Sequence, residues 1–188
     1  PTHSQSLQSW FAHIPGLKVV MPTFPIDAKN LLISSIQDPN PVIFLEHRWL
    51  HNIKDIDMIS DGEIKPYKSR ICRVGNDITI VSISFLTIEA LKAANYLERT
   101  YKISVEVIDL IHVKPIDYST ITNSISKTHR ICVVDSGFHT CSIASEIISH
   151  ICENNYDELN SAPGKLAMPD CPEPTSFGLT KDFYIRSG

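Results

Sequence analysis

Hydrophobic and polar positions alternate along the chain with two different periods. Apolar residues spaced three and four apart predict helices near residues 7–14, 25–37, 88–97, 117–125 and 143–151. Runs rich in Ile, Val and Leu predict short strands near residues 17–21, 42–45, 77–85, 104–111 and 131–134. Strands that alternate with helices are typical of βαβ units, which close with right-handed crossovers. The pattern therefore predicts an α/β fold with a mainly parallel sheet.

Two of the predicted helices have a clear apolar stripe. In the first, Leu7, Trp10, Phe11 and Ile14 fall at positions i, i+3, i+4 and i+7. In the second, apolar residues repeat every four positions at Ala28, Leu32 and Ile36. We expect these stripes to face the core of the protein.

The stretch from residue 53 to residue 73 lacks this periodicity. It carries nine charged residues, one glycine and one proline, a composition typical of a segment wrapped over the surface between domains. We therefore expect three parts. The second half of one α/β domain spans residues 1–52, a linker spans 53–73, and a second α/β domain spans 74–188.

The composition is that of a chain that folds around its own core. Its 188 residues are 43% hydrophobic and 20% charged, and a chain of this length needs no disulfide to stabilise it. The net charge of −4 disfavours nucleic acid and anionic membranes as partners. No apolar run approaches the roughly 20 residues of a membrane span. The five cysteines form no C-x-x-C pair, which indicates free thiols in a protein that is not secreted and argues against a cysteine zinc site.

The two ends of the chain predict a piece of a longer protein. The chain begins at Pro1 without an initiator methionine and ends at Gly188 just after an aromatic-rich segment. We expect such a piece to be inactive by itself. We also expect it to associate through a broken sheet edge and an exposed part of its core.

One histidine stands where α/β proteins often place catalytic groups. His3 lies in the loop before the first predicted helix, and loops carried by a rigid scaffold supply many catalytic side chains. Imidazole also changes its charge near neutral pH. A solvated histidine near a helix start is the simpler interpretation of the residue type alone.

The remaining candidate chemistry in the sequence is weaker. Glu46, His47 and His51 have a spacing like that of a helical zinc pair, but they follow a strand and no third ligand stands out. A polar strand end is the simpler interpretation. The seven glycines form no phosphate-binding loop. Residues 135–137 follow a strand and could line a crevice, although a tight turn explains them more simply.

Four segments, taken in chain order, carry a more specific pattern. They are THSQSLQSWFAHIPGLKVVMP, DAKNLLISSIQDPNPVIFLEHRWL, ISVEVIDLIHVKPID and AMPDCPEPTSFGLTKDFY. Together they resemble the β subunit of the decarboxylating component of 2-oxo acid dehydrogenase complexes, of the pyruvate, branched-chain or acetoin type. The resemblance implies a transketolase-like fold and dependence on thiamine diphosphate. It identifies residues 1–52 with the second half of a pyrimidine-binding domain and residues from about 74 onward with a transketolase C-terminal-like domain.

The resemblance also implies roles for particular residues. His3 matches the active-site histidine of the HSQS motif, which donates protons and orients the substrate during decarboxylation and acyl transfer to lipoamide. A structural potassium site, built mostly from main-chain carbonyl groups, is matched by Ser35, Ile36, Asp38 and Asn40. The glutamate that activates the cofactor lies upstream of the first residue. The diphosphate and its magnesium ion belong to the other subunit.

The partners implied by the resemblance are an α subunit, a second β subunit and a dihydrolipoyl acyltransferase core. The implied location is the bacterial cytoplasm or the matrix of mitochondria or plastids. Two alternatives stay open. A transketolase-class enzyme would need cationic residues for sugar phosphates, and residues 1–52 hold only three Lys or Arg. A non-catalytic dimerisation or docking module would need no chemistry from His3.

Overall fold

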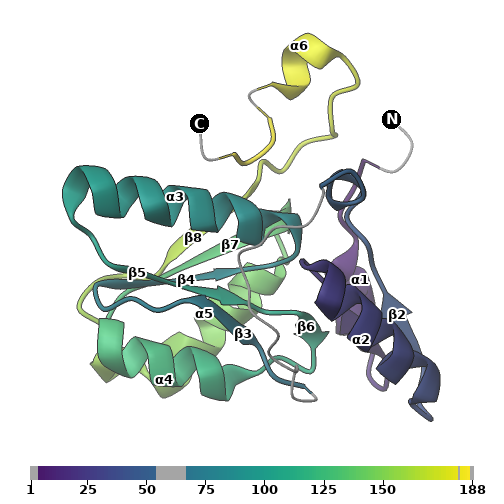
Figure 1. Ribbon diagram of the computed structural model, residues 1–188, viewed down its shortest axis with the longest axis horizontal. Coiled ribbons are helices and arrows are strands. Elements are labelled where there is room, and N and C mark those ends of the chain that lie inside the picture. The colour runs from purple at the N-terminus through teal and green to yellow at the C-terminus, as the bar shows by residue number, and fades with distance from the viewer. Residues whose placement is uncertain (1–3, 54–66, 182, 187–188) are drawn as a thin grey trace.

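The chain is organised around two β-sheets (Figure 1). The computed structural model describes residues 4–53, 67–181 and 183–186, and within these ranges one sheet has three strands and the other has five. The strands are β1 (Lys18–Val20), β2 (Val42–Phe44), β3 (Arg70–Arg73), β4 (Ile78–Ser82), β5 (Val105–Asp109), β6 (His112–Lys114), β7 (Ile131–Phe138) and β8 (Gly164–Met168). The α-helices are α1 (Gln8–His13), α2 (Pro25–Gln37), α3 (Phe85–Tyr101), α4 (Tyr118–Thr128), α5 (Ile143–Asn154) and α6 (Phe177–Thr180). Short 3₁₀ helices lie at Arg48–Leu50 and Tyr156–Glu158.

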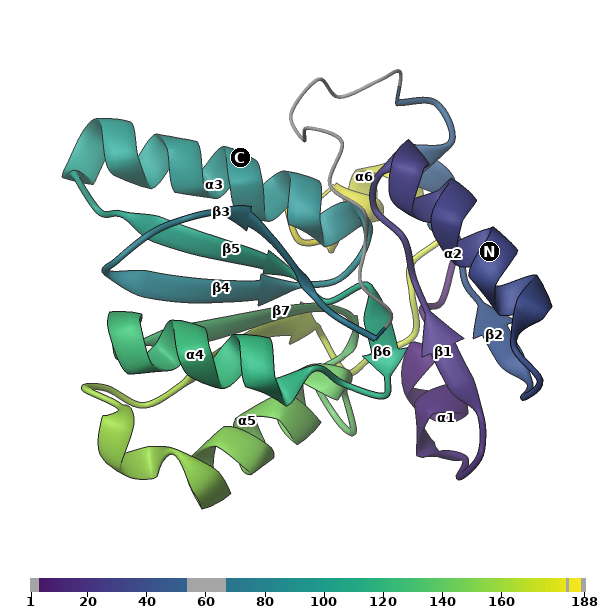
Figure 2. The same ribbon diagram turned by 60° about the horizontal axis from the view of Figure 1, so that its bottom comes forward.

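The smaller sheet joins early and late parts of the chain. Its order is β2-β1-β6, with β1 parallel to β2 and antiparallel to β6. Successive residues on a strand face opposite sides, so Val19 shares a core with Phe11 of α1, whereas Val20 packs with Leu31 of α2. The two helices therefore cover opposite faces. Figure 2 shows β6 beside β1, so a strand from the later part of the chain completes a sheet begun by the first part.

The larger sheet is a three-layer α/β arrangement. Its order is β3-β5-β4-β7-β8, and all of its strand pairs are parallel except β3 with β5. α3 covers one face, where Leu91 and Ala94 share a core with Ile80 and Val107. α4 and α5 cover the opposite face with the buried residues Ile121, Ile125, Ile147 and Ile151 (Figure 1). The predicted α/β fold with mostly parallel strands is confirmed.

Several helices and strands are not predicted by the periodicity of the sequence. β3 has the sequence RICR and lies within the range 53–73 that the sequence indicates as a linker; residues 54–66 of that range lie outside the described residues. Charged residues are usual on an edge strand because they protect its unpaired backbone. β8 begins with a glycine, and its Leu166 is 52% exposed. β6 has three residues and α6 has four, too few for a period to show.

The apolar stripes of the first two helices face outward more than the sequence predicts. Trp10 is 72% exposed and Ile36 is 77% exposed, whereas Gln8 and Asp27 are fully buried on the same two helices. The helices form where the sequence predicts them, and Phe11 of the first stripe packs against the core. Trp10, Leu32 and Ile36 of the two stripes are exposed instead, and polar contacts described below bind Gln8 and Asp27 on the inward faces.

A polar junction fixes the smaller sheet to the larger one. The hydroxyl of Thr23, just after β1, donates to the main-chain carbonyl of Ser84 at 3.0 Å, and the Ser84 hydroxyl donates to the carbonyl of Pro22 at 3.1 Å. The carbonyl of Ile111 accepts from the amide of Met21 at 2.8 Å. Ser84 and Ile111 have φ angles of 53° and 55°, which are costly for residues other than glycine. Their hydrogen bonds across the junction help to hold this strained backbone.

Two buried carboxyl groups lie at the same junction. Asp27 of α2 accepts two hydrogen bonds from Arg70 of β3, at 3.2 Å from Nε and 2.5 Å from Nη2. Asp109, the last residue of β5, accepts a hydrogen bond from the hydroxyl of Thr87 at 3.1 Å. Burial raises the pKa of Asp109 to about 7, and the charge of Asp27 also raises it. Burial raises the pKa of Asp27 as well, against the opposing effect of Arg70.

A buried glutamate ties α4 to the larger sheet. Glu106 of β5 accepts hydrogen bonds from Ser124 and Lys127 of α4, and from the main-chain amide of Gly75 at 3.3 Å. The backbone of Gly75 lies so close to Val105 that a β-carbon added there would be 2.1 Å from the carbonyl carbon of Val105. The side-chain space at position 75 is therefore filled by the neighbouring strand.

Replacing Gly75 by alanine is expected to lower the free energy of unfolding by about 2–3 kcal/mol, because the backbone must move away from Val105 and from Glu106. Urea denaturation followed by circular dichroism measures this change. Gly178→Ala is the matched control, since the nearest atom to an added β-carbon is 3.8 Å away, and its effect should stay below about 0.5 kcal/mol. A Gly75→Ala chain as stable as the wild type would contradict the close approach of these strands.

Asp109→Asn is expected to change how stability depends on pH. The pKa of Asp109 is about 7 in the folded state and about 3.9 in an unfolded chain. Between these values the folded state binds more protons, so this group lowers the stability of the wild type as pH rises. From about pH 4 to about pH 8 the variant should gain up to roughly 4 kcal/mol relative to the wild type.

Denaturant titrations across this pH range measure the relative stability of the Asp109→Asn chain. Asp157→Asn removes an exposed carboxyl group and controls for the loss of one charge. A difference between the Asp109 variant and the wild type that stays constant with pH would show that Asp109 is not buried as described.

Candidate active site

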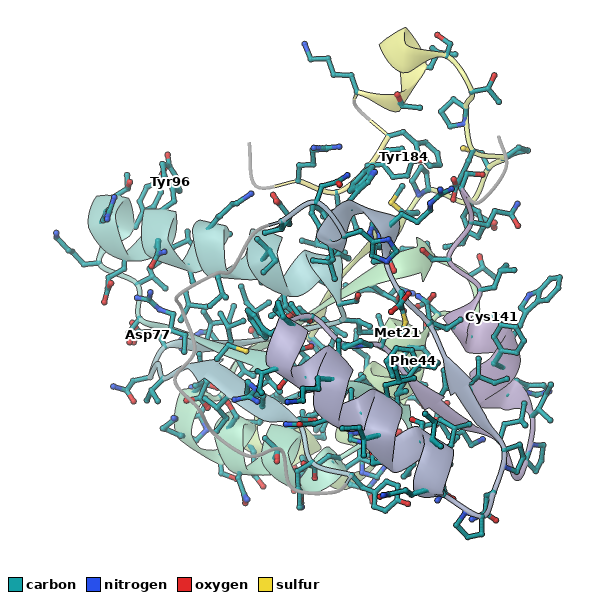
Figure 3. All side chains as sticks on the ribbon, turned by 45° about the vertical axis from the view of Figure 1, so that its right-hand side comes forward. Met21, Phe44, Asp77, Tyr96, Cys141 and Tyr184 are labelled. Atoms are coloured by element: carbon teal, nitrogen blue, oxygen red, sulfur yellow. The ribbon has the colours of Figure 1, made fainter. Side chains whose placement is uncertain are left out.

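A cavity of about 650 Å³ opens where the carboxyl ends of strands from both sheets meet. Met21 follows β1, Leu45 follows β2, Phe85 begins α3 after β4, and Met168 ends β8. Figure 3 labels Met21 in the interior and Tyr184, another lining residue, on the C-terminal segment. Open α/β sheets bind ligands at this edge, and the volume is within the usual range of ligand cavities.

The loop that follows His3 forms part of the cavity wall. Its lining residues are Ser4, Gln5, Ser6 and Leu7, and Gln8 at the start of α1 continues the wall. His3 itself lies outside the described residues. The structure thus places the chain neighbours of the predicted catalytic histidine at the cavity, and the role of His3 stays a prediction.

A buried hydrogen bond anchors this loop to the larger sheet. Gln8 is fully buried, and its Nε2 donates to Asp135 Oδ1 at 2.7 Å and to the Ser136 hydroxyl at 3.3 Å. Asp135 also accepts from the main-chain amides of Gly137 at 2.8 Å and Ala144 at 3.0 Å. Residues 135–137 belong to β7 rather than to a turn. Ser136 lines the cavity, while Asp135 acts as a buried anchor.

Aromatic rings from three distant parts of the chain cluster beside the cavity. Trp49 meets the rings of Phe85 and Tyr184 edge-on, with centroids 5.0 and 5.2 Å apart. The guanidinium group of Arg186 lies 4.4 Å from the centre of the Trp49 ring. These contacts hold the C-terminal segment against the loop after β2. The sequence pattern does not identify the cluster, because its members are brought together only by the fold.

His47 is held in this cluster as a neutral imidazole. Its ring stacks on Phe85 at 5.1 Å and meets Trp49 at 5.3 Å. Its Nδ1 accepts a hydrogen bond from the main-chain amide of Trp49 at 3.3 Å, which assigns the proton of the neutral ring to Nε2. Burial, together with the nearby charge of His51, lowers the pKa of His47 to about 4.

The zinc-like spacing around His47 does not produce a metal site in the described residues. The stretch Arg48–Leu50 is a 3₁₀ helix rather than an α-helix. His51 instead has its Nε2 3.5 Å from a carboxylate oxygen of Glu46. In the part of the chain that the structure describes, no three His, Cys, Asp or Glu residues lie close enough together to hold a metal ion.

The residues matched to a potassium site lie at the end of α2 and in the turn that follows, and they are Ser35, Ile36, Asp38 and Asn40. The side chain of Asp38 is fully engaged. One oxygen accepts from the ammonium group of Lys18 and from the hydroxyl of Tyr67, and the other accepts from the main-chain and side-chain amides of Asn40. The bonds from Lys18 and Asn40 hold the pKa of Asp38 well below its usual range. Its carboxylate therefore organises the turn rather than offering a free oxygen.

Both parts of the chain match known protein families. The family "Transketolase, C-terminal domain" matches residues 67–187, and "Transketolase, pyrimidine binding domain" matches residues 1–53. The chain is 40% identical over 180 residues to the pyruvate dehydrogenase E1 component subunit beta of Rhizobium meliloti, covering 95% of this chain and 39% of that protein. It is 40% identical over 186 residues to the Mesostigma viride subunit, covering 98% and 56%. It is 36% identical over 190 residues to the mitochondrial subunit of Dictyostelium discoideum, covering 98% and 53%.

A solved structure shares the fold. It is described as "Split gene transketolase, inactive beta4 tetramer", and it aligns with a TM-score of 0.79 and 21% identity over 96% of this chain and 57% of that chain. The chain spans about half the length of most of the curated relatives it matches, and 39% of the Rhizobium protein. The resemblance drawn from the four sequence segments is confirmed: the chain belongs to the transketolase family, and it is 36–40% identical to pyruvate dehydrogenase E1 β subunits across most of its length.

Proposed function

We propose that the chain is part of the β subunit of a thiamine-diphosphate-dependent 2-oxo acid dehydrogenase. The enzyme decarboxylates a pyruvate-like 2-oxo acid and passes the acyl group to lipoamide. The working assembly in this proposal is an α2β2 heterotetramer. The chain is inactive by itself, because the cofactor is held between two different subunits.

The observation that carries the proposal is the position of the cavity. It lies at the ligand-binding edge of both sheets, and the residues directly after His3 form part of its wall. The named relatives with 36–40% identity are subunits of a pyruvate dehydrogenase component. The position of the cavity and the similarity to pyruvate dehydrogenase subunits thus both support decarboxylation of a 2-oxo acid as the proposed reaction.

The described residues suit the ring portion of thiamine diphosphate better than its charged end. Part of the cavity wall is apolar, which suits the faces of the cofactor's rings. This part is formed by Met21, Leu45, Phe85 and Met168. The described part of the chain offers no cluster of metal-ligating side chains, and the proposal assigns the diphosphate and its magnesium ion to the α subunit. When bound, the cofactor supplies the carbon nucleophile and the electron sink for decarboxylation.

His3 has the proton-transfer role in this proposal. It donates a proton at the keto oxygen of the substrate and orients the acyl group for transfer, and imidazole is the side chain that most often performs such general acid–base steps. The anchor between Gln8 and Asp135 keeps the following loop in place. A rigid loop is what positions such a group within reach of the substrate.

The turn after α2 is proposed to bind potassium through main-chain carbonyl groups. Ser35 and Ile36 lie in the last turn of α2, where carbonyl groups lack donors from the helix itself. Pro39 has no amide hydrogen to offer them. The carbonyl end of a helix favours a cation, and a hard cation favours oxygen ligands.

The proposed partners are an α subunit, a second β subunit and a dihydrolipoyl acyltransferase core. The relatives include subunits named as mitochondrial, and we propose the bacterial cytoplasm or an organelle matrix as the location. The net charge of −4 gives no electrostatic case for nucleic acid. None of the described helices combines the length and apolar composition needed to cross a bilayer.

His3→Ala is expected to lower the turnover of the assembled enzyme by at least about 100-fold, because it removes the proton donor. The protein is reconstituted with its α subunit, magnesium and thiamine diphosphate, and reduction of an artificial electron acceptor is followed. Pyruvate, branched 2-oxo acids, acetoin and a sugar phosphate are compared as substrates. His13→Ala, an exposed histidine on α1, is the matched control and should keep wild-type turnover. Unchanged turnover in His3→Ala would remove His3 from the mechanism, and activity with the sugar phosphate alone would refute the proposed substrate class.

Removing potassium is expected to lower the midpoint of thermal unfolding by about 2–5 °C, since an ion bound only to the folded state stabilises it. Thermal unfolding is measured in potassium chloride and in tetramethylammonium chloride at equal ionic strength. A sodium chloride arm separates specific binding from general cation effects. Equal midpoints in all three salts would rule out the potassium site.

A further inference from the structure

Among the described residues that line the cavity, Arg48 is a charged side chain without an ionic or hydrogen-bonding partner in the described chain. Other charged groups nearby are engaged. Glu46 faces His51 at 3.5 Å, Arg186 lies over the Trp49 ring, and Glu173 accepts the Tyr184 hydroxyl at 3.1 Å. Arg48 therefore contributes a positive charge to a wall that also carries the carboxylate of Glu46.

The neighbouring His47 lines the same cavity and has a hydrogen-bond donor to offer. Because its Nδ1 accepts from the Trp49 amide, its Nε2 carries the proton, and that N–H has no partner among the residues that the structure describes. Stacking on Phe85 and edge contact with Trp49 restrict the ring. These ring contacts fix the orientation of the His47 Nε2–H group. Burial also disfavours protonation of the ring, so His47 acts as a neutral hydrogen-bond donor.

We propose that Arg48 and His47 form a carboxylate-binding subsite within the cavity. The proposal rests on the proposed function and deepens it, because it names the group by which an acidic 2-oxo substrate is recognised. A guanidinium group recognises a carboxylate through charge-assisted hydrogen bonds, and the N–H of His47 satisfies a further lone pair. Leu45 and Phe85 line the same cavity, and Arg48 is solvent-exposed, so its guanidinium group is accessible to an incoming carboxylate.

One cation and one neutral donor suit a singly charged carboxylate better than a phosphate dianion. Glu46 also lines the cavity, and its charge opposes a second negative charge on the ligand. The carboxylate could be the reacting group of a monocarboxylic 2-oxo acid or the distal group of a dicarboxylic one. Both carboxylates would be recognised by the same contacts. Comparing the binding of a monocarboxylic and a dicarboxylic 2-oxo acid distinguishes them.

Trp49 provides a direct measure of binding, since its ring lies 5.3 Å from His47. The chain has two tryptophans, and replacing the exposed Trp10 by phenylalanine isolates the Trp49 fluorescence. Pyruvate, its neutral ester methyl pyruvate and 2-oxoglutarate are titrated into the full chain in the absence of thiamine diphosphate. We expect a saturable change in Trp49 fluorescence with pyruvate or 2-oxoglutarate. The affinity for methyl pyruvate should be at least about tenfold lower.

Arg48→Gln is expected to weaken binding of the acid by about tenfold or more and to abolish the preference over the ester. His47→Phe keeps an aromatic ring on Phe85 but removes the N–H donor, and we expect it to weaken binding about fivefold. Arg99→Gln, an exposed arginine on α3, is the matched control and should leave binding unchanged. Tighter binding of 2-oxoglutarate than of pyruvate identifies the distal carboxylate as the ligand, and the reverse order identifies the reacting one.

Equal affinity for pyruvate and methyl pyruvate, or wild-type affinity in Arg48→Gln, would overturn the subsite. The binding measurement needs no catalysis, so it is independent of the proposed reaction. In the assembled enzyme, Arg48→Gln should raise the KM for the 2-oxo acid more than it lowers kcat. An enzyme that binds the acid but never decarboxylates it would refute the proposed function and leave the subsite standing.

Discussion

The geometry of the candidate active site depends on one buried carboxylate. Asp135 on β7 accepts hydrogen bonds from Gln8 of α1, from Gly137 on its own strand and from Ala144 at the start of α5. A buried carboxylate without such donors would be costly, so its environment fixes all three elements at once. The loop of residues 4–7 leads directly into α1. Its place on the cavity wall therefore follows from this anchor.

The second constraint is that the two sheets meet through polar groups as well as apolar ones. Hydrophobic burial has no direction, whereas the hydrogen bonds between Thr23 and Ser84, and between Met21 and Ile111, require defined distances and angles. The strained backbone at Ser84 and Ile111 is consistent with such a requirement, because strain persists only where surrounding contacts determine the conformation. These contacts thus define how the two sheets meet beside the cavity.

Two adjacent residues of the cavity wall offer different interactions to a ligand. Burial disfavours the protonated form of His47, while the adjacent Arg48 brings a guanidinium group with several N–H donors. Two neighbours in the sequence therefore supply different kinds of donor.

The sequence alone determined the α/β class, the family, helices α1–α5 and strands β1, β2, β4, β5 and β7, because periodicity and local motifs are properties of consecutive residues. It also directed attention to His3 and to the loop around it. It did not reveal the short elements β3, β6, β8 and α6. It could not decide which face of α1 or α2 is buried, since Trp10 and Ile36 are exposed while Gln8 and Asp27 are inside. On those inward faces Gln8 and Asp27 bind Asp135 and Arg70, which lie 127 and 43 residues away along the chain. The aromatic cluster and the neutral state of His47 likewise exist only after folding, because burial and ring contacts are properties of three-dimensional neighbours.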